Sequence, residues 1–164
     1  MTRPTDSDII REQERRLRFD SFDLATAWEL GTRLRALALE RGQAVLIEVR
    51  LGKRPVFLSA MPGTGAANAD WARRKANTVE LLERSTYGVG VAPPHPEGTV
   101  YERMGLSARD YAVAGGGFPI FLSGGICVGA VIVSGLPQRE DHKLIVEALA
   151  GMLGLPHGDF LLDA

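Results

Sequence analysis

One lysine stands where the sequence otherwise predicts an apolar surface. In the segment 69–85, ADWARRKANTVELLERS, apolar side chains recur at helical spacing from Ala72 to Leu82, and Lys75 falls inside this stripe. Lysine is almost never fully buried without a partner. Two interpretations stay open. The ammonium either escapes to water at the edge of a sheet, or it is a cation held at the rim of a pocket, near a carboxylate, a carbonyl cluster or an interface. Trp71 flanks the same stripe and is interpreted as a core or interface residue rather than a stacking platform.

A second group of candidate residues lies where an apolar strand ends, in the segment 133–142, VSGLPQREDH. Gly135 permits backbone conformations that other residues avoid, and Asp141 is a plausible N-cap of the last helix. The first free amides of that helix would then lie near Ser134 and Gly135. A helix N-terminus beside a glycine turn is a natural anion site, although every capped helix shares this pattern.

Histidine and cysteine patterns point to no standard catalytic or metal site. His142 falls in the first turn of the last helix and is expected to be exposed, with a metal or haem ligand as the minority interpretation. Cys127 lies inside an apolar strand and is expected to be a small buried hydrophobe. The sequence has no HExxH motif, paired-cysteine zinc spacing, phosphate loop or hydrolase elbow. The pattern therefore predicts no metal, and leaves open whether the protein is an enzyme.

The elements that position these residues predict an α+β fold. A continuous apolar strand, ICVGAVIVS, indicates a central position with both faces covered. Short links between strands favour antiparallel pairing. We therefore expect a three-layer α/β/α domain with a five-stranded, mainly antiparallel sheet. The expected elements, in chain order, are a helix over 23–42, strands 44–50 and 54–60, a helix over 69–85, strands 86–92, 118–123 and 126–134, and a helix from about Asp141.

The N-terminal residues 1–18 differ from the rest, which is expected to form one domain over residues 19–164. This arm is charged, and its apolar side chains Ile9, Ile10 and Leu17 are too few for a core of their own. It either frays or docks on a neighbouring subunit. The segment 93–105, PPHPEGTVYERMG, is a long connection of the kind that is usually functional or pinned by contacts. We therefore expect a homo-oligomer, at least a dimer.

Composition narrows the class of protein. The chain has 164 residues and a formal net charge of -1, so its charge attracts neither nucleic acid nor an anionic membrane. It has no run of about 18 apolar residues and no signal-peptide core at its N-terminus. Its single cysteine agrees with a reducing compartment. These features predict a cytoplasmic protein of one domain, without nucleic-acid or membrane partners.

Three segments together resemble a known family. They are DLATAWELG, DWARRKANTVELLERSTYGVG and GGGFPIFLSGGICVGAVIVSGLPQREDHKLIVEAL, and they resemble the haem-degrading-domain family of GlcG-like and HbpS-like proteins, closest to its branch of small uncharacterised cytoplasmic proteins. The resemblance implies a profilin-like domain of order α-β(2)-α-β(3)-α, stable homo-oligomers and, in some relatives, binding of haem or a related tetrapyrrole. It carries over no catalytic set. The residues that match its motifs are Trp71, Lys75, Gly116, Phe118, Pro119, Ser134, Gly135, Asp141 and His142.

Two functions follow as hypotheses. The first is an oligomeric small-ligand-binding protein, with haem as a possible cofactor and the matching residues, Pro119 apart, around the ligand. The alternative is a non-catalytic oligomeric scaffold or accessory protein, because the chain shows no set of acid, base and nucleophile.

Overall fold

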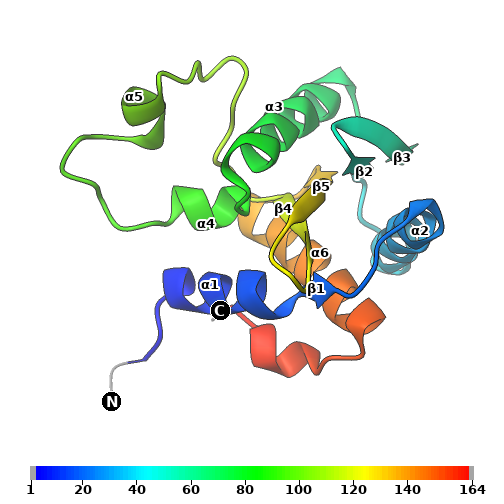
Figure 1. Cartoon of the computed structure of the whole chain (residues 1–164). Coiled ribbons are helices and arrows are strands. Elements are labelled where there is room, and N and C mark those ends of the chain that lie inside the picture. Colours follow the sequence, from blue (N-terminus) through cyan, green and yellow to red (C-terminus); the bar gives the residue numbers. More distant parts are fainter. Residues whose placement is uncertain (1–2, 163–164) are drawn as a thin grey trace.

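The computed structural model describes residues 3–162 of the chain (Figure 1). Residues 1–2 of the expected arm and residues 163–164 of the expected domain lie outside the described residues. The elements follow in the order α1 (Asp6–Arg16), β1 (Arg18–Phe19), α2 (Leu24–Glu40), β2 (Leu46–Leu51), β3 (Arg54–Ala60), α3 (Ala66–Leu82), α4 (Thr86–Gly90), α5 (Val100–Met104), β4 (Gly117–Leu122), β5 (Cys127–Ser134), α6 (Gln138–Leu153) and the 3-10 helix η1 (His157–Phe160).

Strand β5 occupies the middle of a five-stranded sheet whose strand order is β1-β4-β5-β2-β3. The pairs β2–β3, β2–β5 and β4–β5 are antiparallel, and β1 pairs parallel with β4. The sheet is therefore mixed and mostly antiparallel, which confirms the predicted α+β class and the central place of the apolar strand.

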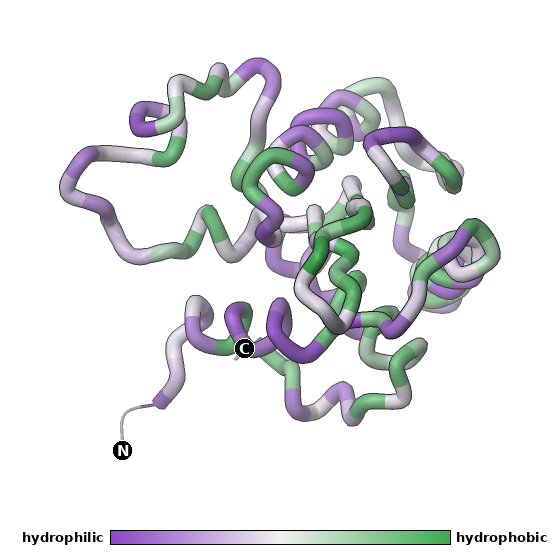
Figure 2. Tube along the Cα trace, viewed as in Figure 1, coloured by the Kyte–Doolittle hydropathy of each residue, from purple (hydrophilic) through white to green (hydrophobic). Residues whose placement is uncertain are grey.

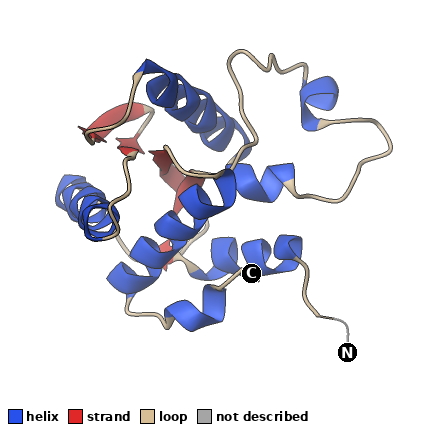
Figure 3. Ribbon diagram, turned by 180° about the vertical axis from the view of Figure 1, so that it is seen from behind, coloured by secondary structure: helices blue, strands red, loops and turns tan. Residues whose placement is uncertain are grey.

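Helices cover both faces of the sheet, so β5 is apolar on both sides. Alternate residues of a strand point to opposite faces. Ala130 and Ile132 pack with the inner face of α3, whereas Val131 and Val133 belong to the larger core under α2 and α6. Figures 1 and 3 show these helices from opposite sides, and Figure 2 shows the hydrophobic residues gathered along the central strands.

The strand expected at residues 86–92 is wrong, because Thr86–Gly90 forms the short helix α4. The Ser85 side chain caps this helix by accepting a hydrogen bond of 3.1 Å from the Gly88 amide. The alternation of apolar residues in TYGVGVA is typical of a strand, but the Ser85 cap starts a helix at this place. The fifth strand is instead β1, so the order α-β(2)-α-β(3)-α does not hold at these two places.

The expected arm packs on its own chain. Thr5 and Asp8 form a capping box that starts α1. Ile10 and Leu17 are fully buried, and Ile10 contacts Tyr87 of α4 and Leu162 near the C-terminus. The argument that these side chains need a neighbouring subunit is therefore wrong, because α4 and the C-terminal segment supply the surface.

Helix α2 begins after its N-cap Asp23, one of the two caps, Asp20 and Asp23, that the sequence allows. The expected apolar stripe of this helix, from Leu24 to Ala38, is wrong at two residues, since Leu24 is 56% and Trp28 is 64% exposed. The Trp28 ring contacts Phe57 of β3 edge-on, with centroids 5.5 Å apart. This leaves an apolar ring on the surface beside the edge strand.

Neither a membrane-spanning helix nor a metal-binding cluster is found within residues 3–162. Between residues 3 and 162, every helix is too short or too polar to cross a membrane. The same residues bring no three His, Cys, Asp or Glu side chains into a group that would hold a metal ion. Cys127 is half-buried, and burial raises the pKa of its thiol, which disfavours the reactive thiolate.

Candidate functional site

Lys75 points from α3 toward the end of β5 and is only 3% exposed. Its Nζ donates hydrogen bonds to the Val133 carbonyl at 3.0 Å and to Asp141 Oδ2 at 3.1 Å. The helical spacing that placed Lys75 in the apolar stripe of α3 is therefore confirmed. Of the two interpretations, escape of the ammonium to water is wrong, and a cation held by a carboxylate and a carbonyl is confirmed.

Asp141 reaches Lys75 from α6, where it is the fourth helical residue and not the N-cap. The helix begins earlier, after Pro137, whose missing side-chain donor or acceptor leaves the first turn without a side-chain cap. The second oxygen of Asp141, Oδ1, accepts a bond of 3.0 Å from the Leu136 amide. The expected N-cap is thus corrected, although the carboxylate still binds the backbone that precedes the helix.

Burial pulls both members of this pair toward their neutral forms. Loss of water contact is the largest influence on Lys75 and lowers its pKa, while the charge of Asp141 opposes the shift. Burial likewise raises the pKa of Asp141, and Lys75 opposes that shift. The ion pair is therefore closer in free energy to its proton-transferred, neutral form than an exposed pair would be.

A cavity of about 280 Å³, which we call the Lys75 pocket, opens beside this ion pair. It lies between α3, the end of β5 and the start of α6. Five of the predicted site residues come together here. The lining residues are Asn68, Trp71, Lys75, Ala114, Ser134, Gly135, Leu136, Gln138 and Asp141.

The Lys75 pocket is rich in hydrogen-bond donors that lack a protein acceptor. Ser134 lines the cavity, and its hydroxyl makes no hydrogen bond within residues 3–162. Asn68 and Gln138 each use their amide oxygen to accept a backbone N–H, from Gly65 and Gly115 respectively. Their NH2 groups are left without a partner among the described residues. This donor set suits an acceptor-rich ligand such as a carboxylate.

Trp71 forms an outer wall of the pocket. It is 41% exposed, and the Arg74 guanidinium lies over its ring at 4.2 Å from the centroid. Among the described residues no carboxylate pairs with Arg74 within ion-pair distance, so its charge is available at the mouth. Trp71 is thus a rim residue that packs against a cation.

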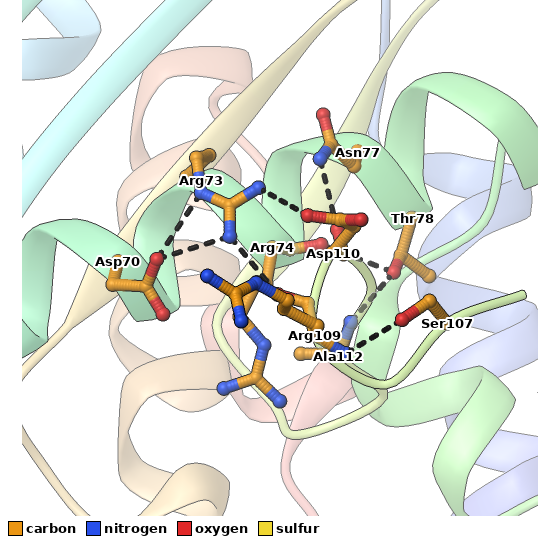
Figure 4. Close-up of polar contacts among 9 residues, drawn as sticks. All are labelled: Asp70, Arg73, Arg74, Asn77, Thr78, Ser107, Arg109, Asp110 and Ala112. Carbon is orange, nitrogen blue, oxygen red and sulfur yellow. Dashed lines mark hydrogen bonds and ion pairs between the residues drawn. The ribbon is translucent and has the colours of Figure 1, made fainter.

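Figure 4 shows a loop held against α3 by polar contacts, and Ala114, which follows this loop, lines the pocket. Arg73 bonds Asp110 at 3.0 Å and the Arg109 carbonyl at 2.9 Å. Asn77 and Thr78, one turn further along α3, bond the backbone of Asp110 and Ala112. These contacts hold the chain that leads to Ala114, so the pocket has a preformed wall.

Two glycines allow the backbone to approach the ion pair. A Cβ on Gly116 would lie 2.6 Å from Lys75 Nζ and would overlap the Val133 carbonyl oxygen, and its φ of +120° excludes most other residues. A Cβ on Gly135 would overlap the Ala44 carbonyl oxygen. Gly135 lines the pocket, while Gly116 lies behind the ammonium.

Phe118 and His142 lie in the core and not in the pocket. The expectation of an exposed His142 is wrong, because its side chain is 0% exposed. Its ring packs against Tyr87 and Phe118, with centroids 5.3 and 5.9 Å away, and Nε2 lies 2.7 Å from Gln13 Oε1. Burial lowers the pKa of His142 to about 3, so the ring is neutral at physiological pH.

A larger cavity, which sequence reasoning missed, lies between α4 and the projecting loop that carries α5 (Figure 1). This loop cleft has a volume of about 610 Å³. The proline-rich segment 93–105 is the sequence feature that indicates this cleft, because a long connection within a compact domain is usually functional or pinned by contacts. Its length alone does not predict a pocket. The lining includes the apolar Leu82, Val89, Met104 and Val113 and the polar Arg84, His95, Tyr101 and Arg103.

The chain is similar to a protein family, to curated relatives and to solved structures. A family model described as haem degrading protein HbpS-like matches residues 22–150. A UPF0303 protein of Azotobacter vinelandii is 57% identical over 148 residues, 90% of this chain and 89% of that protein. The crystal structure of Ybr137w has a TM-score of 0.81 and 24% identity, over 93% of this chain and 90% of that one. A PduOC:haem complex has a TM-score of 0.68 and 18% identity, over 79% and 94%.

Proposed function

This chain belongs to the HbpS-like family of haem degrading proteins, as its motifs suggested, and from that premise we propose that it binds a small organic acid in the Lys75 pocket. The observation that carries the proposal is the set of donors that lines the cavity, since the Ser134 hydroxyl and the NH2 groups of Asn68 and Gln138 have no acceptor among the described residues. A ligand oxygen supplies an acceptor for these donors.

Charge favours a carboxylate as the group that supplies this oxygen. The negative charge of Asp141 is already matched by Lys75 at 3.1 Å, so it does not repel an acid strongly. Arg74 adds a positive charge at the mouth, over the Trp71 ring. Asn68 and Gln138 line the cavity, and each keeps an NH2 group without a protein partner as a further donor. Hydrogen bonds to a charged group contribute about 1.5–3 kcal/mol each.

Calorimetric titration with lactate and with pyruvate tests the proposal. We expect both acids to bind, and Ser134→Ala to weaken binding by about 10-fold to 150-fold, because one charge-assisted hydrogen bond is lost. Ser59→Ala is the matched control, since Ser59 is a strand serine on the edge strand β3 that does not line the cavity. Equal affinity of the Ser134→Ala variant and the unchanged protein, or no binding of either acid at millimolar concentration, would contradict the proposal.

Haem or a related tetrapyrrole is a second candidate ligand, and it belongs in a different place. The Lys75 pocket has no His, Cys, Met or Tyr among its lining residues, so it does not suit haem iron. The loop cleft does, because His95, Tyr101 and Met104 line a volume of about 610 Å³. Haem bound there would supply redox and oxygen chemistry, and Arg84 and Arg103 would pair with its acidic groups.

Absorbance titration with haem separates the two ligands. Binding in the loop cleft is expected to shift the haem absorbance band and to be lost in His95→Ala, while Ser134→Ala leaves it unchanged. His95 Nδ1 accepts a bond of 3.1 Å from the Glu97 amide, so in the neutral ring Nε2 carries the proton and must lose it before it ligates iron. A band shift that survives His95→Ala excludes this histidine as the ligand.

We also propose that the chain forms homo-oligomers, and a scaffold role without a ligand remains the alternative function. Exposed apolar side chains support assembly, with Leu24 and Trp28 on α2 and Leu58 on the edge strand β3 at 56%, 64% and 63% exposure. Light scattering is expected to give at least twice the mass of one chain, and Trp28→Glu to lower it. A single-chain mass at micromolar concentration would contradict assembly.

A further inference from the structure

One N–H group of the Lys75 ammonium has no acceptor among the described residues, and the ammonium lies at the wall of a cavity. An ammonium group has three N–H donors. Two of them are used within the described chain, by the Val133 carbonyl and by Asp141. Lys75 is itself a lining residue of the Lys75 pocket, so a bound ligand meets this nitrogen directly.

A carboxylate lies within proton-transfer range of the same nitrogen. Asp141 Oδ2 is 3.1 Å from Nζ, and its other oxygen is anchored by the Leu136 amide. The Asp141 side chain therefore keeps its position while it accepts or returns a proton. Ser134, also in the wall, offers a hydroxyl to an oxygen that develops charge.

We propose that Lys75 is a nucleophile that forms a Schiff base with a small oxo acid in the Lys75 pocket. This inference rests on the proposed function and deepens it, because it names the ligand as an acid with a carbonyl beside its carboxylate. The volume of about 280 Å³ equals the share of roughly nine waters in the liquid, which suits an acid of a few carbon atoms.

The step balances without an oxidant or reductant. Asp141 takes one proton from the Lys75 ammonium, and the freed lone pair forms a bond to the carbonyl carbon. The π pair of the carbonyl moves to its oxygen, which receives the proton back from Asp141. A second proton, from the nitrogen by way of Asp141, then lets this oxygen leave as water while the C=N bond forms. The products are one protonated imine and one water.

The electrostatics of the pair agree with this role. Burial lowers the pKa of Lys75 and so raises the fraction of free amine at neutral pH. Burial also raises the pKa of Asp141, which makes its protonated form accessible as the acid. Desolvated lysines are activated as Schiff-base nucleophiles in this way.

Reductive trapping on the intact protein tests the inference. The chain has three lysines, Lys53, Lys75 and Lys143, so two of them serve as internal references. The protein is incubated with pyruvate and borohydride, and peptides are mapped by mass spectrometry. We expect the reduced pyruvate adduct on Lys75 to exceed that on the other two lysines, because Lys75 lines the cavity and its lowered pKa raises the free-amine fraction.

Three variants and one ligand control sharpen the result. Lactate has no carbonyl and must give no adduct. Lys75→Arg keeps the charge and must lose the adduct, while Lys143→Arg must keep it. Asp141→Asn must slow trapping while Lys75 remains present. Because borohydride traps the native protein directly, the mapped adduct does not depend on whether any variant folds.

The outcomes separate this inference from the proposed function. If calorimetry shows pyruvate and lactate binding alike and no adduct forms on Lys75, the Schiff base is overturned and acid binding stands. If neither acid binds and no adduct forms, both fail. Equal labelling of Lys53, Lys75 and Lys143 overturns the inference, because it reports only ordinary surface amines.

Discussion

Replacing Lys75 with methionine removes the ammonium but keeps much of the volume of its aliphatic stem. The change leaves Asp141 buried without its cation, with the Leu136 amide as its remaining donor. The Val133 carbonyl also loses the donor that Lys75 supplied at 3.0 Å. Removal of one partner from a buried ion pair typically costs about 3–5 kcal/mol of the free energy of unfolding. For a chain of this length this corresponds to a melting temperature lower by roughly 6–20 °C.

The loss should depend on pH in a defined direction. Without Lys75, burial outweighs the backbone hydrogen bonds to Asp141 and raises its folded-state pKa above the unfolded value of about 3.9. Below that value both states carry the proton, so the buried carboxylate has no unfavourable charge. As the pH rises, the unfolded state loses its proton first, and the Lys75→Met variant becomes progressively less stable until its raised folded pKa is passed.

Urea unfolding at pH 4 and pH 7 measures this effect, with Lys75→Met/Asp141→Asn as the partner variant. Asparagine keeps an oxygen for the Leu136 amide but carries no charge. We expect the double variant to recover at least about 2 kcal/mol of the loss at pH 7, in the range of coupling energies between contacting residues. A loss below about 1 kcal/mol in Lys75→Met, equal at both pH values, would refute the buried ion pair.

Three further predictions concern the residues that hold the fold around the site. Ser85→Ala removes the cap of α4 and should lower the free energy of unfolding in urea by about 0.5–2 kcal/mol; no change would show that the cap is dispensable. Burial lowers the pKa of His142 from 6.5 to about 3. The free energy of unfolding should therefore fall as the pH drops below about 6.5, by up to about 1.4 kcal/mol per pH unit. His142→Leu should remove this contribution, so that its unfolding midpoints at pH 7 and pH 5 differ less than those of the parent protein. Gly116→Ala should lower the free energy of unfolding by at least about 2 kcal/mol, because its Cβ overlaps the Val133 carbonyl. Gly124→Ala is the control and should melt within a few degrees of the parent protein, because the space around Gly124 is open. Equal melting temperatures of the two variants would contradict the close approach at Gly116.

The sequence identified Lys75 for a physical reason, since a charge inside an apolar stripe must find a partner when the helix packs on a sheet. It also marked Ser134, Gly135 and Asp141 because they follow a buried strand. The role of Asp141 was wrong because α6 begins at Gln138, earlier than expected. Pro137 precedes the helix but has no side chain that can cap it, so the acidic Asp141 is the stronger sequence signal for the start of α6.

The error at His142 has a different origin. Its position relative to the core stripe of α6 made it look exposed, but α6 is also covered on the side that faces α1, α4 and η1. Gln13 of α1 hydrogen-bonds the ring at Nε2, whereas Nδ1 has no partner among the described residues. Because the sequence predicts an arm for residues 1–18, it does not predict that α1 buries this side of α6. The loop cleft was missed for a similar reason, since a loop's path through space is set by contacts that no local pattern records.

The contact between α1 and the end of the chain has a consequence for synthesis. Gln13 Nε2 donates a bond of 2.7 Å to the Phe160 carbonyl, and Ile10 packs with Leu162. On the ribosome, α1 emerges well before residues 160–162, which cover it. Until those residues are made, the apolar face of α1 lacks its complete partner, while the hairpins and their helices assemble from nearer contacts. The contact between α1 and residues 160–162 is therefore expected to form late in folding.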